Sequence, residues 1–119
     1  ELGATYHDSI DGLLPHCDFL SLHCPSTPET RGMVNSDFIA KLPDGATLIP
    51  GVIGHCTDFI EHPDLVAERL IRYANLVGKE NLLAGTDCGL GHRVGHESIC
   101  WAKLESLVEG AKRASAKLW

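Results

Sequence analysis

The stretch Ala46-Thr-Leu-Ile-Pro-Gly-Val-Ile53 decides the fold class of this chain. It is rich in β-branched residues, and apolar side chains occupy both odd and even positions. This pattern is typical of a parallel strand covered on both faces, because a half-exposed strand alternates apolar with polar residues. We therefore expect residues 46–53 to form the buried central strand of a parallel sheet.

Length and composition predict a single globular domain over residues 1–119. The chain has 119 residues, of which 44% are hydrophobic, which is enough for one core. Its formal net charge of −6 argues against nucleic acid and against an anionic membrane surface as partners. The five cysteines are an odd number without a compact framework, which is typical of reduced thiols in a cytoplasmic protein.

Four apolar segments alternate with four helical segments along the chain. The expected strands are residues 3–7, 18–23, 46–53 and 81–85. The expected helices run from Asp8 or Ser9 to Leu14, from Asn35 or Ser36 to Leu42, from Pro63 to the residue before Gly78, and from Glu97 to Leu118. On the last helix, the residues expected to face the core are Cys100, Leu104, Leu107, Val108, Ala111 and Leu118. The alternation predicts an α/β fold with a parallel sheet of about four strands.

Right-handed crossovers leave two architectures open. Strands laid down side by side would carry all helices on one face and leave an apolar face bare, which a monomer avoids. Either the strand order reverses and gives a Rossmann- or flavodoxin-like sandwich, or two chains meet as half-barrels of four strand–helix units. The open edge expected beside residues 18–23 favours pairing, so we expect a homodimer.

Three segments of the first half carry a family resemblance: Asp18-Phe-Leu-Ser-Leu-His-Cys-Pro-Ser-Thr-Pro-Glu-Thr30, Met33-Val-Asn35 and Leu42-Pro-Asp-Gly-Ala46. With them, residues 3 to about 49 resemble part of the NAD-binding domain of D-2-hydroxyacid dehydrogenases. In that family the loop after this strand lies against the cofactor, so the resemblance implies cofactor contacts at Cys24, Pro25 and Thr27.

The sequence also departs from that family. It lacks the glycine-rich phosphate loop and the acidic ribose-binding residue that the family places before these segments. Where the family's catalytic arginine is expected, the chain has Pro50-Gly-Val-Ile-Gly-His55. These departures predict no dehydrogenase activity.

The second half carries other motifs: Ile49-Pro-Gly-Val-Ile53, Glu61-His-Pro63, Leu83-Ala-Gly-Thr-Asp-Cys-Gly89, Trp101-Ala-Lys-Leu104 and Leu107-Val-Glu-Gly-Ala111. Residues from about 46 to 119 resemble the C-terminal end of the cobalamin-independent methionine synthase family, a zinc-dependent (β/α)₈ barrel. The resemblance implies a zinc-binding role for Cys88. The family's remaining ligands have no counterparts in this sequence, and one cysteine does not make a zinc site.

Histidine and cysteine side chains follow three of the expected strands. They are His23 and Cys24, His55 and Cys56, and Cys88 and His92. Ligand sites gather at the carboxyl ends of parallel strands, so these side chains could converge on zinc or a similar ion. The alternative is that they are half-buried loop residues that bind no metal. Cys88, His92, His96 and Cys100 have helical spacing, but the glycines among them indicate a loop.

Two resemblances that meet at residues 46–53, each with an incomplete active site, favour a non-catalytic, engineered or chimeric α/β domain. The first alternative is a remnant zinc-dependent thiol methyltransferase site at Cys88, His55 and Cys56. The second alternative is a nucleotide-binding module. On the leading hypothesis the chain is not an enzyme and needs no cofactor, with zinc as the one metal to test.

Overall fold

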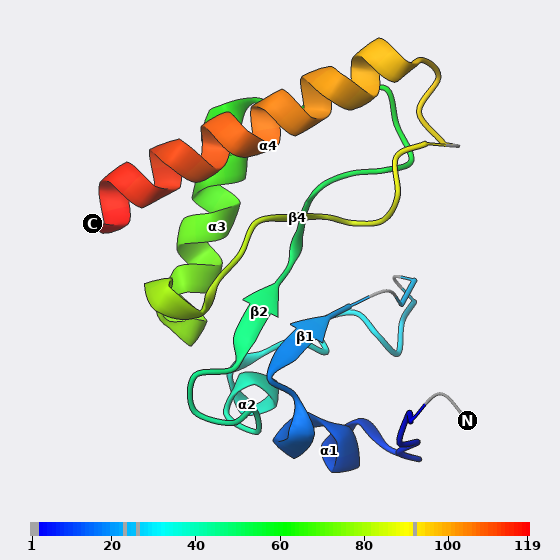
Figure 1. Ribbon diagram of the computed structural model, residues 1–119, viewed down its shortest axis with the longest axis vertical. Helices are drawn as coiled ribbons and strands as arrows, with labels where there is room; N and C mark the ends of the chain where they lie inside the picture. The colour runs from blue at the N-terminus through cyan, green and yellow to red at the C-terminus, as the bar shows by residue number, and fades with distance from the viewer. Residues whose placement is uncertain (1–2, 23, 26, 92) are drawn as a thin grey trace.

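The computed structural model describes residues 3–22, 24–25, 27–91 and 93–119 (Figure 1). Its helices are α1 (Ile10–Leu13), α2 (Ser36–Ile39), α3 (Pro63–Val77) and α4 (Glu97–Leu118), with 3₁₀ turns at Leu14–His16 and Lys79–Asn81. Its strands are β1 (Phe19–Ser21), β2 (Thr47–Ile49), β3 (Gly51–Ile53) and β4 (Gly85–Thr86). Figure 1 shows α1 and α2 at one end, α3 and α4 at the other, and the strands between them.

All strand pairs are parallel, which confirms the predicted α/β class. β1 pairs with β2, with Leu20 opposite Leu48, and β3 pairs with β4. An isolated parallel bridge joins Leu48 to Leu82, so the 82–86 segment continues beside β2. The predicted central strand therefore exists, but its first part, β2, pairs with β1 and its second part, β3, pairs with β4.

Pro50 divides the expected strand 46–53 into β2 and β3. Proline has no backbone N–H and cannot donate to a ladder. Its carbonyl still accepts from Gly85 N at 3.2 Å, and Ile53 O accepts from Asp87 N at 2.9 Å. The described residues thus form two two-stranded sheets rather than one sheet of four strands.

The predicted strand at residues 3–7 is wrong. These residues have no regular structure, and Gly3 has a φ of +67°, a left-handed conformation that ends an extended run. Residues 3–6 are exposed, including the large side chain of Tyr6, so no buried side chain holds the segment against the sheet. The other predicted elements are present, but α1, α2, β1 and β4 are shorter than the predicted segments. Ser9, Asn35 and His62 cap α1, α2 and α3 with their side chains.

Two hydrophobic clusters form the core. The first contains Leu14, Leu20, Phe38 and Leu48 beneath α2. The second contains Val52, Ile53, Val66, Ala67, Leu70 and Ala114 beneath α3 and α4. Tyr73 and Leu82 pack against both clusters and join them.

One face of the strands is open. Phe19 and Leu83 alternate with the buried Leu20 and the bridged Leu82, and they are 67% and 52% exposed. The radius of gyration is 15.4 Å, against about 13.5 Å for a compact domain of this length. An exposed apolar face was expected for strands laid down side by side. The homodimer expected from such a face stays a prediction.

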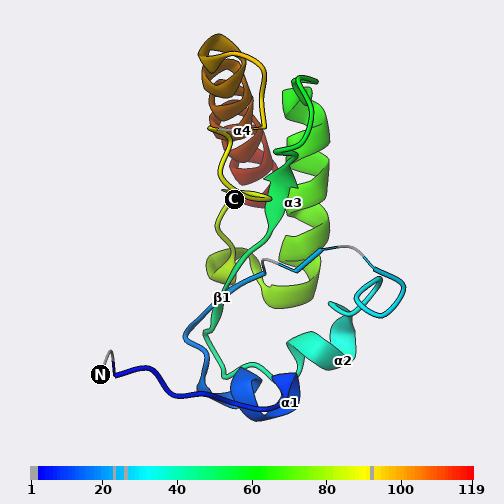
Figure 2. The ribbon, with the colours of Figure 1, turned by 90° about the vertical axis from the view of Figure 1, so that its right-hand side faces the viewer.

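The face that α4 turns toward α3 differs from the predicted one. The buried residues are Lys103, Ser106, Gly110 and Ala114, whereas Val108 is 54% exposed. Figure 2 shows the two helices side by side. A Cβ built on Gly110 would lie 2.5 Å from Val66 Cβ, so the helices pack closely over a stripe of small side chains. Of the predicted inward residues, Leu107 and Ala111 pack at the border of the core.

A buried ion pair ties α4 to the loop after β3. Lys103 Nζ lies 3.0 Å from Glu61 Oε2, and both side chains are almost fully buried. Glu61 Oε1 accepts from Gly54 N at 2.7 Å, and Lys103 Nζ also donates to Phe59 O. Burial raises the pKa of Glu61, but the Gly54 N–H and the Lys103 ammonium outweigh it and hold that pKa below its usual value.

Among the described residues, no helix is both long and apolar enough to span a bilayer.

We predict that Gly110→Ala destabilises the protein by about 1–3 kcal/mol through overpacking, although alanine is the better helix former. Urea unfolding followed by circular dichroism measures the change. Gly91→Ala is the matched control, because a Cβ there would meet no atom within 4 Å. Equal stability of the two variants would show that α3 and α4 pack less closely than described.

We predict that Lys103→Met lowers the free energy of unfolding by about 3–5 kcal/mol, because it leaves the Glu61 carboxylate buried without its cation. Lys112→Met, an exposed change on the same helix, should alter it by less than about 0.5 kcal/mol. The double variant Lys103→Met/Glu61→Leu should recover much of the loss. An additive double variant would contradict a coupled buried pair.

Acid should weaken the fold through Glu61. Because its folded-state pKa is lowered, its contribution is complete above the unfolded-state value and is lost as the pH falls below about 4.5. Urea midpoints between neutral and acidic pH should fall more steeply for the wild type than for Glu61→Gln. Parallel curves would assign the acid sensitivity to other carboxylates.

Candidate functional site

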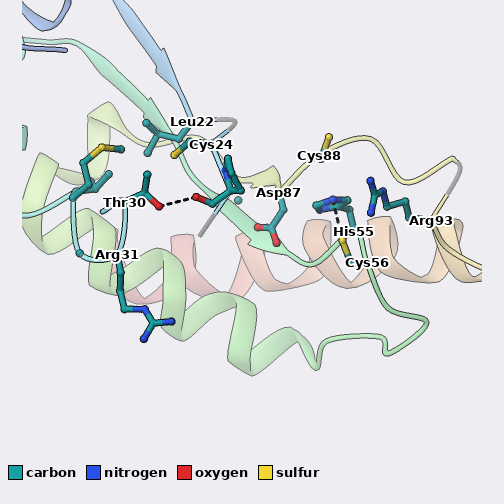
Figure 3. A pocket seen from close by; sticks show the side chains of 14 residues that line it. Leu22, Cys24, Thr30, Arg31, His55, Cys56, Asp87, Cys88 and Arg93 are labelled. Atoms are coloured by element: carbon teal, nitrogen blue, oxygen red, sulfur yellow. Dashed lines mark hydrogen bonds between the residues drawn. The ribbon is translucent and has the colours of Figure 1, made fainter. Parts of the chain in front are cut away.

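A cavity of about 750 Å³ opens at the carboxyl ends of β1, β3 and β4 (Figure 3). Leu22, Cys24 and Pro25 line it from the segment after β1, followed by the 30–34 turn. His55 and Cys56 line it from the segment after β3, and Asp87, Cys88 and Arg93 from the segment after β4. Open α/β sheets bind ligands at this end of their strands. The topology thus places five of the predicted site residues around one cavity: Cys24, Pro25, His55, Cys56 and Cys88.

The loop after β1 is held by two threonines. Thr27 N donates to Thr30 Oγ1 at 2.8 Å, and Thr30 Oγ1 donates to Pro25 O at 2.6 Å. Arg31 N donates to Thr27 O at 2.9 Å and closes the turn. Cys24 and Pro25 reach the cavity, whereas Thr27 shapes the loop without lining it. Cofactor contacts at these three residues stay a prediction.

The segment after β3 carries an adjacent imidazole and thiol. His55 Nε2 lies 3.1 Å from Cys56 Sγ, within hydrogen-bond distance. His55 Nδ1 is buried and has no hydrogen-bond partner within the described part of the chain. Nε2 is therefore the ring nitrogen available to exchange a proton at this wall of the cavity.

Gly51 makes room for Asp87. A Cβ on Gly51 would overlap Asp87 Oδ1, so a larger residue would displace this side chain. Figure 3 shows the Asp87 carboxylate between the Cys24 side and the His55 side.

Sequence reasoning missed the two cations of the cavity. Arg31 lines it from the turn after the first loop, and Arg93 lines it from the loop after β4. The signal that could have found them is the strand-end rule, which was applied to histidine and cysteine but not to arginine. Together with Asp87 they make the lining mixed in charge, with a surplus of positive groups.

The predicted metal ligands are neighbours but do not form a cluster. His55, Cys56 and Cys88 line the same cavity, yet Figure 3 shows the Cys88 thiol pointing away from the other two. Residues 3–22, 24–25, 27–91 and 93–119 contain no group of three His, Cys, Asp or Glu side chains placed to hold a metal ion. His23 and His92 lie outside the described residues. Zinc binding at Cys88, His55 and Cys56 stays a prediction.

His96 and Cys100, which belong to the four-residue spacing that begins at Cys88, have structural roles. His96 Nδ1 accepts from Ser98 N at 3.2 Å and caps α4. The Cys100 thiol donates to Leu90 O at 3.8 Å and fastens the loop to the helix. All five cysteines are free.

Comparison with protein families gives a match over residues 1–76 to the family described as D-isomer specific 2-hydroxyacid dehydrogenase, NAD binding domain. The match crosses residues 46–53, where the two resemblances were predicted to meet, and it runs through nearly all of α3. No solved structure matches the chain.

Curated relatives agree with the family. The chain is 40% identical over 58 residues to formate dehydrogenase 2, mitochondrial, of Oryza sativa subsp. japonica, covering 49% of this chain and 15% of that protein. It is 47% identical over 55 residues to glycerate dehydrogenase of Hyphomicrobium methylovorum, covering 46% and 17%. It is 35% identical over 68 residues to D-3-phosphoglycerate dehydrogenase of Mycobacterium leprae, covering 57% and 13%. The chain thus corresponds to a small part of each relative.

These findings correct three predictions. The matched family is an NAD-binding domain of dehydrogenases, and the named relatives are dehydrogenases. The predictions that the chain is a non-catalytic chimera, that it is not an enzyme and that it needs no cofactor are therefore wrong. The comparisons provide no support for the methionine synthase resemblance. The dehydrogenase resemblance is confirmed, since the matched family is the one that the motifs around residues 18–46 indicated. The chain belongs to the NAD-binding domain family of D-isomer specific 2-hydroxyacid dehydrogenases.

Proposed function

We propose that this chain contributes to the NAD(H)-binding domain of a dehydrogenase that acts on a 2-hydroxy acid. The observation that carries the proposal is the cavity at the carboxyl ends of β1, β3 and β4. Its wall includes Cys24 and Pro25, the positions that the family resemblance assigns to the cofactor side. Fold, family and cavity therefore support the same ligand.

The residues present fit a dinucleotide in part. A volume of about 750 Å³ is in the usual range of ligand pockets, and its wall combines apolar groups with a few polar ones. The sequence has no G-x-G-x-x-G pattern, so Arg31 and Arg93 are the groups here that would neutralise phosphates. The Asp87 carboxylate would accept hydrogen bonds from ligand hydroxyl groups.

The chemistry of the bound cofactor would be hydride transfer at the nicotinamide. Residues of this chain would hold and orient the cofactor, with the loop fixed by Thr27 and Thr30 forming one wall. The relatives are named for formate, glycerate and 3-phosphoglycerate, which all carry a carboxylate. We therefore propose a small carboxylate as the class of substrate.

Binding of NADH tests the proposal directly. Titration followed by the fluorescence of the reduced nicotinamide should give saturable binding tighter than about 1 mM. Cys24→Trp should weaken it roughly tenfold, about 1.4 kcal/mol, because an indole would occupy the cavity. Lys112→Trp places the same ring on an exposed position of α4 and should leave binding unchanged.

Two results would count against the proposal. Absence of saturable NADH binding to the folded chain would remove its basis. Equal affinity of Cys24→Trp and Lys112→Trp would place the nucleotide outside this cavity. Circular dichroism on each variant separates loss of binding from loss of structure.

A further inference from the structure

Within residues 3–22, 24–25, 27–91 and 93–119, Cys56 is the one thiol whose hydrogen-bond partner is a base. Its Sγ lies 3.1 Å from His55 Nε2, and the side chain is exposed at the cavity. By contrast, the Cys17 and Cys100 thiols donate to the carbonyl oxygens of Leu13 and Leu90. A carbonyl oxygen holds a thiol in its protonated form, whereas an imidazole can remove the proton.

Two further thiols line the same cavity and serve as an internal comparison. Cys24 and Cys88 are exposed, as Cys56 is. Within the described part of the chain, neither is recorded with an imidazole at hydrogen-bond distance. Exposure to a reagent is therefore similar for the three thiols, and the position of His55 makes the difference.

We propose that Cys56 is a modification site for small disulfides, with His55 as the group that accepts the thiol proton. In the step, Cys56 Sγ attacks one sulfur of the disulfide R–S–S–R. The Sγ–S bond forms as the S–S bond breaks, and the departing R–S⁻ takes the proton from His55 Nε2. The products are Cys56–S–S–R and R–SH, so the disulfide is the oxidant and the balance is complete.

The surroundings of Cys56 favour this exchange. The cavity of about 750 Å³ admits a reagent of several rings without unfolding. Arg31 and Arg93 line the same cavity and contribute positive charge to it. The 3.1 Å contact with the thiol is made by His55 Nε2, whereas Nδ1 of the same ring is buried. The pair is thus arranged for proton exchange before any reagent arrives.

Site-resolved labelling tests the inference. The folded chain is treated with dithiodipyridine in limiting amount, quenched at intervals and analysed by peptide mass spectrometry. Cys56 should react at least about tenfold faster than Cys24 and Cys88, within the range that proton-transfer groups contribute. His55→Ala should lower the Cys56 rate roughly tenfold while the rates at Cys24 and Cys88 hold.

Matched variants keep the test decisive. His16→Ala removes a histidine outside the cavity and should change no rate. His55→Gln keeps a polar side chain of similar reach and should slow Cys56 as His55→Ala does, which answers the case in which the alanine variant fails to fold. Equal rates at the three cavity thiols, or an unchanged Cys56 rate in both His55 variants, would overturn the inference. These rates are measured without nucleotide, so they do not depend on the proposed NADH binding.

Discussion

The missing amide proton of Pro50 shapes the centre of this molecule. Residues 47–53 run extended past it, but the hydrogen-bond ladder with β1 lies before it and the pairing with β4 lies after it. The carbonyl of Pro50 still accepts a hydrogen bond from Gly85 N, so the strand lacks only the hydrogen bond that an N–H at residue 50 would donate. Two core clusters follow from this division, and Tyr73 and Leu82 hold them together. The cavity lies where both halves of the strand system end.

The second constraint acts at the far side of the cavity. The loop that carries His55 and Cys56 is joined to α4 by Glu61, whose carboxylate receives Gly54 N–H on one oxygen and the Lys103 ammonium on the other. Ser106 Oγ bonds the Glu61 carbonyl from the next turn of α4. A buried charge is tolerated here because each of its oxygens is satisfied. The helix therefore positions a wall of the site that it does not itself line.

Local sequence signals predicted the helices and strands. Non-local contacts decided which helix face is buried and where the side chains point. The bounds of α3 and α4 follow from Pro63, Gly78 and the glycine-rich stretch before Glu97, which act within a few residues. The inward face of α4 could not be read from hydrophobicity, because its partner α3 selects the small Gly110 and a paired Lys103. The strand-end rule grouped Cys24, His55, Cys56 and Cys88, and these residues line one cavity. Side chains that line a cavity bind a metal only if they point toward a common centre. Their direction depends on tertiary packing, which the sequence pattern does not reveal.

The Lys103–Glu61 network also gives the protein an unusual response to temperature. The hydration of charged groups becomes less favourable on warming, so the penalty for burying this pair falls as the temperature rises. Hydrophobic contacts, such as those of Val66 and Leu70, gain little over the same range. Warming therefore favours the link between α4 and the 54–61 loop relative to the hydrophobic contacts of the core. The wall carrying His55 and Cys56 keeps this support as the temperature rises.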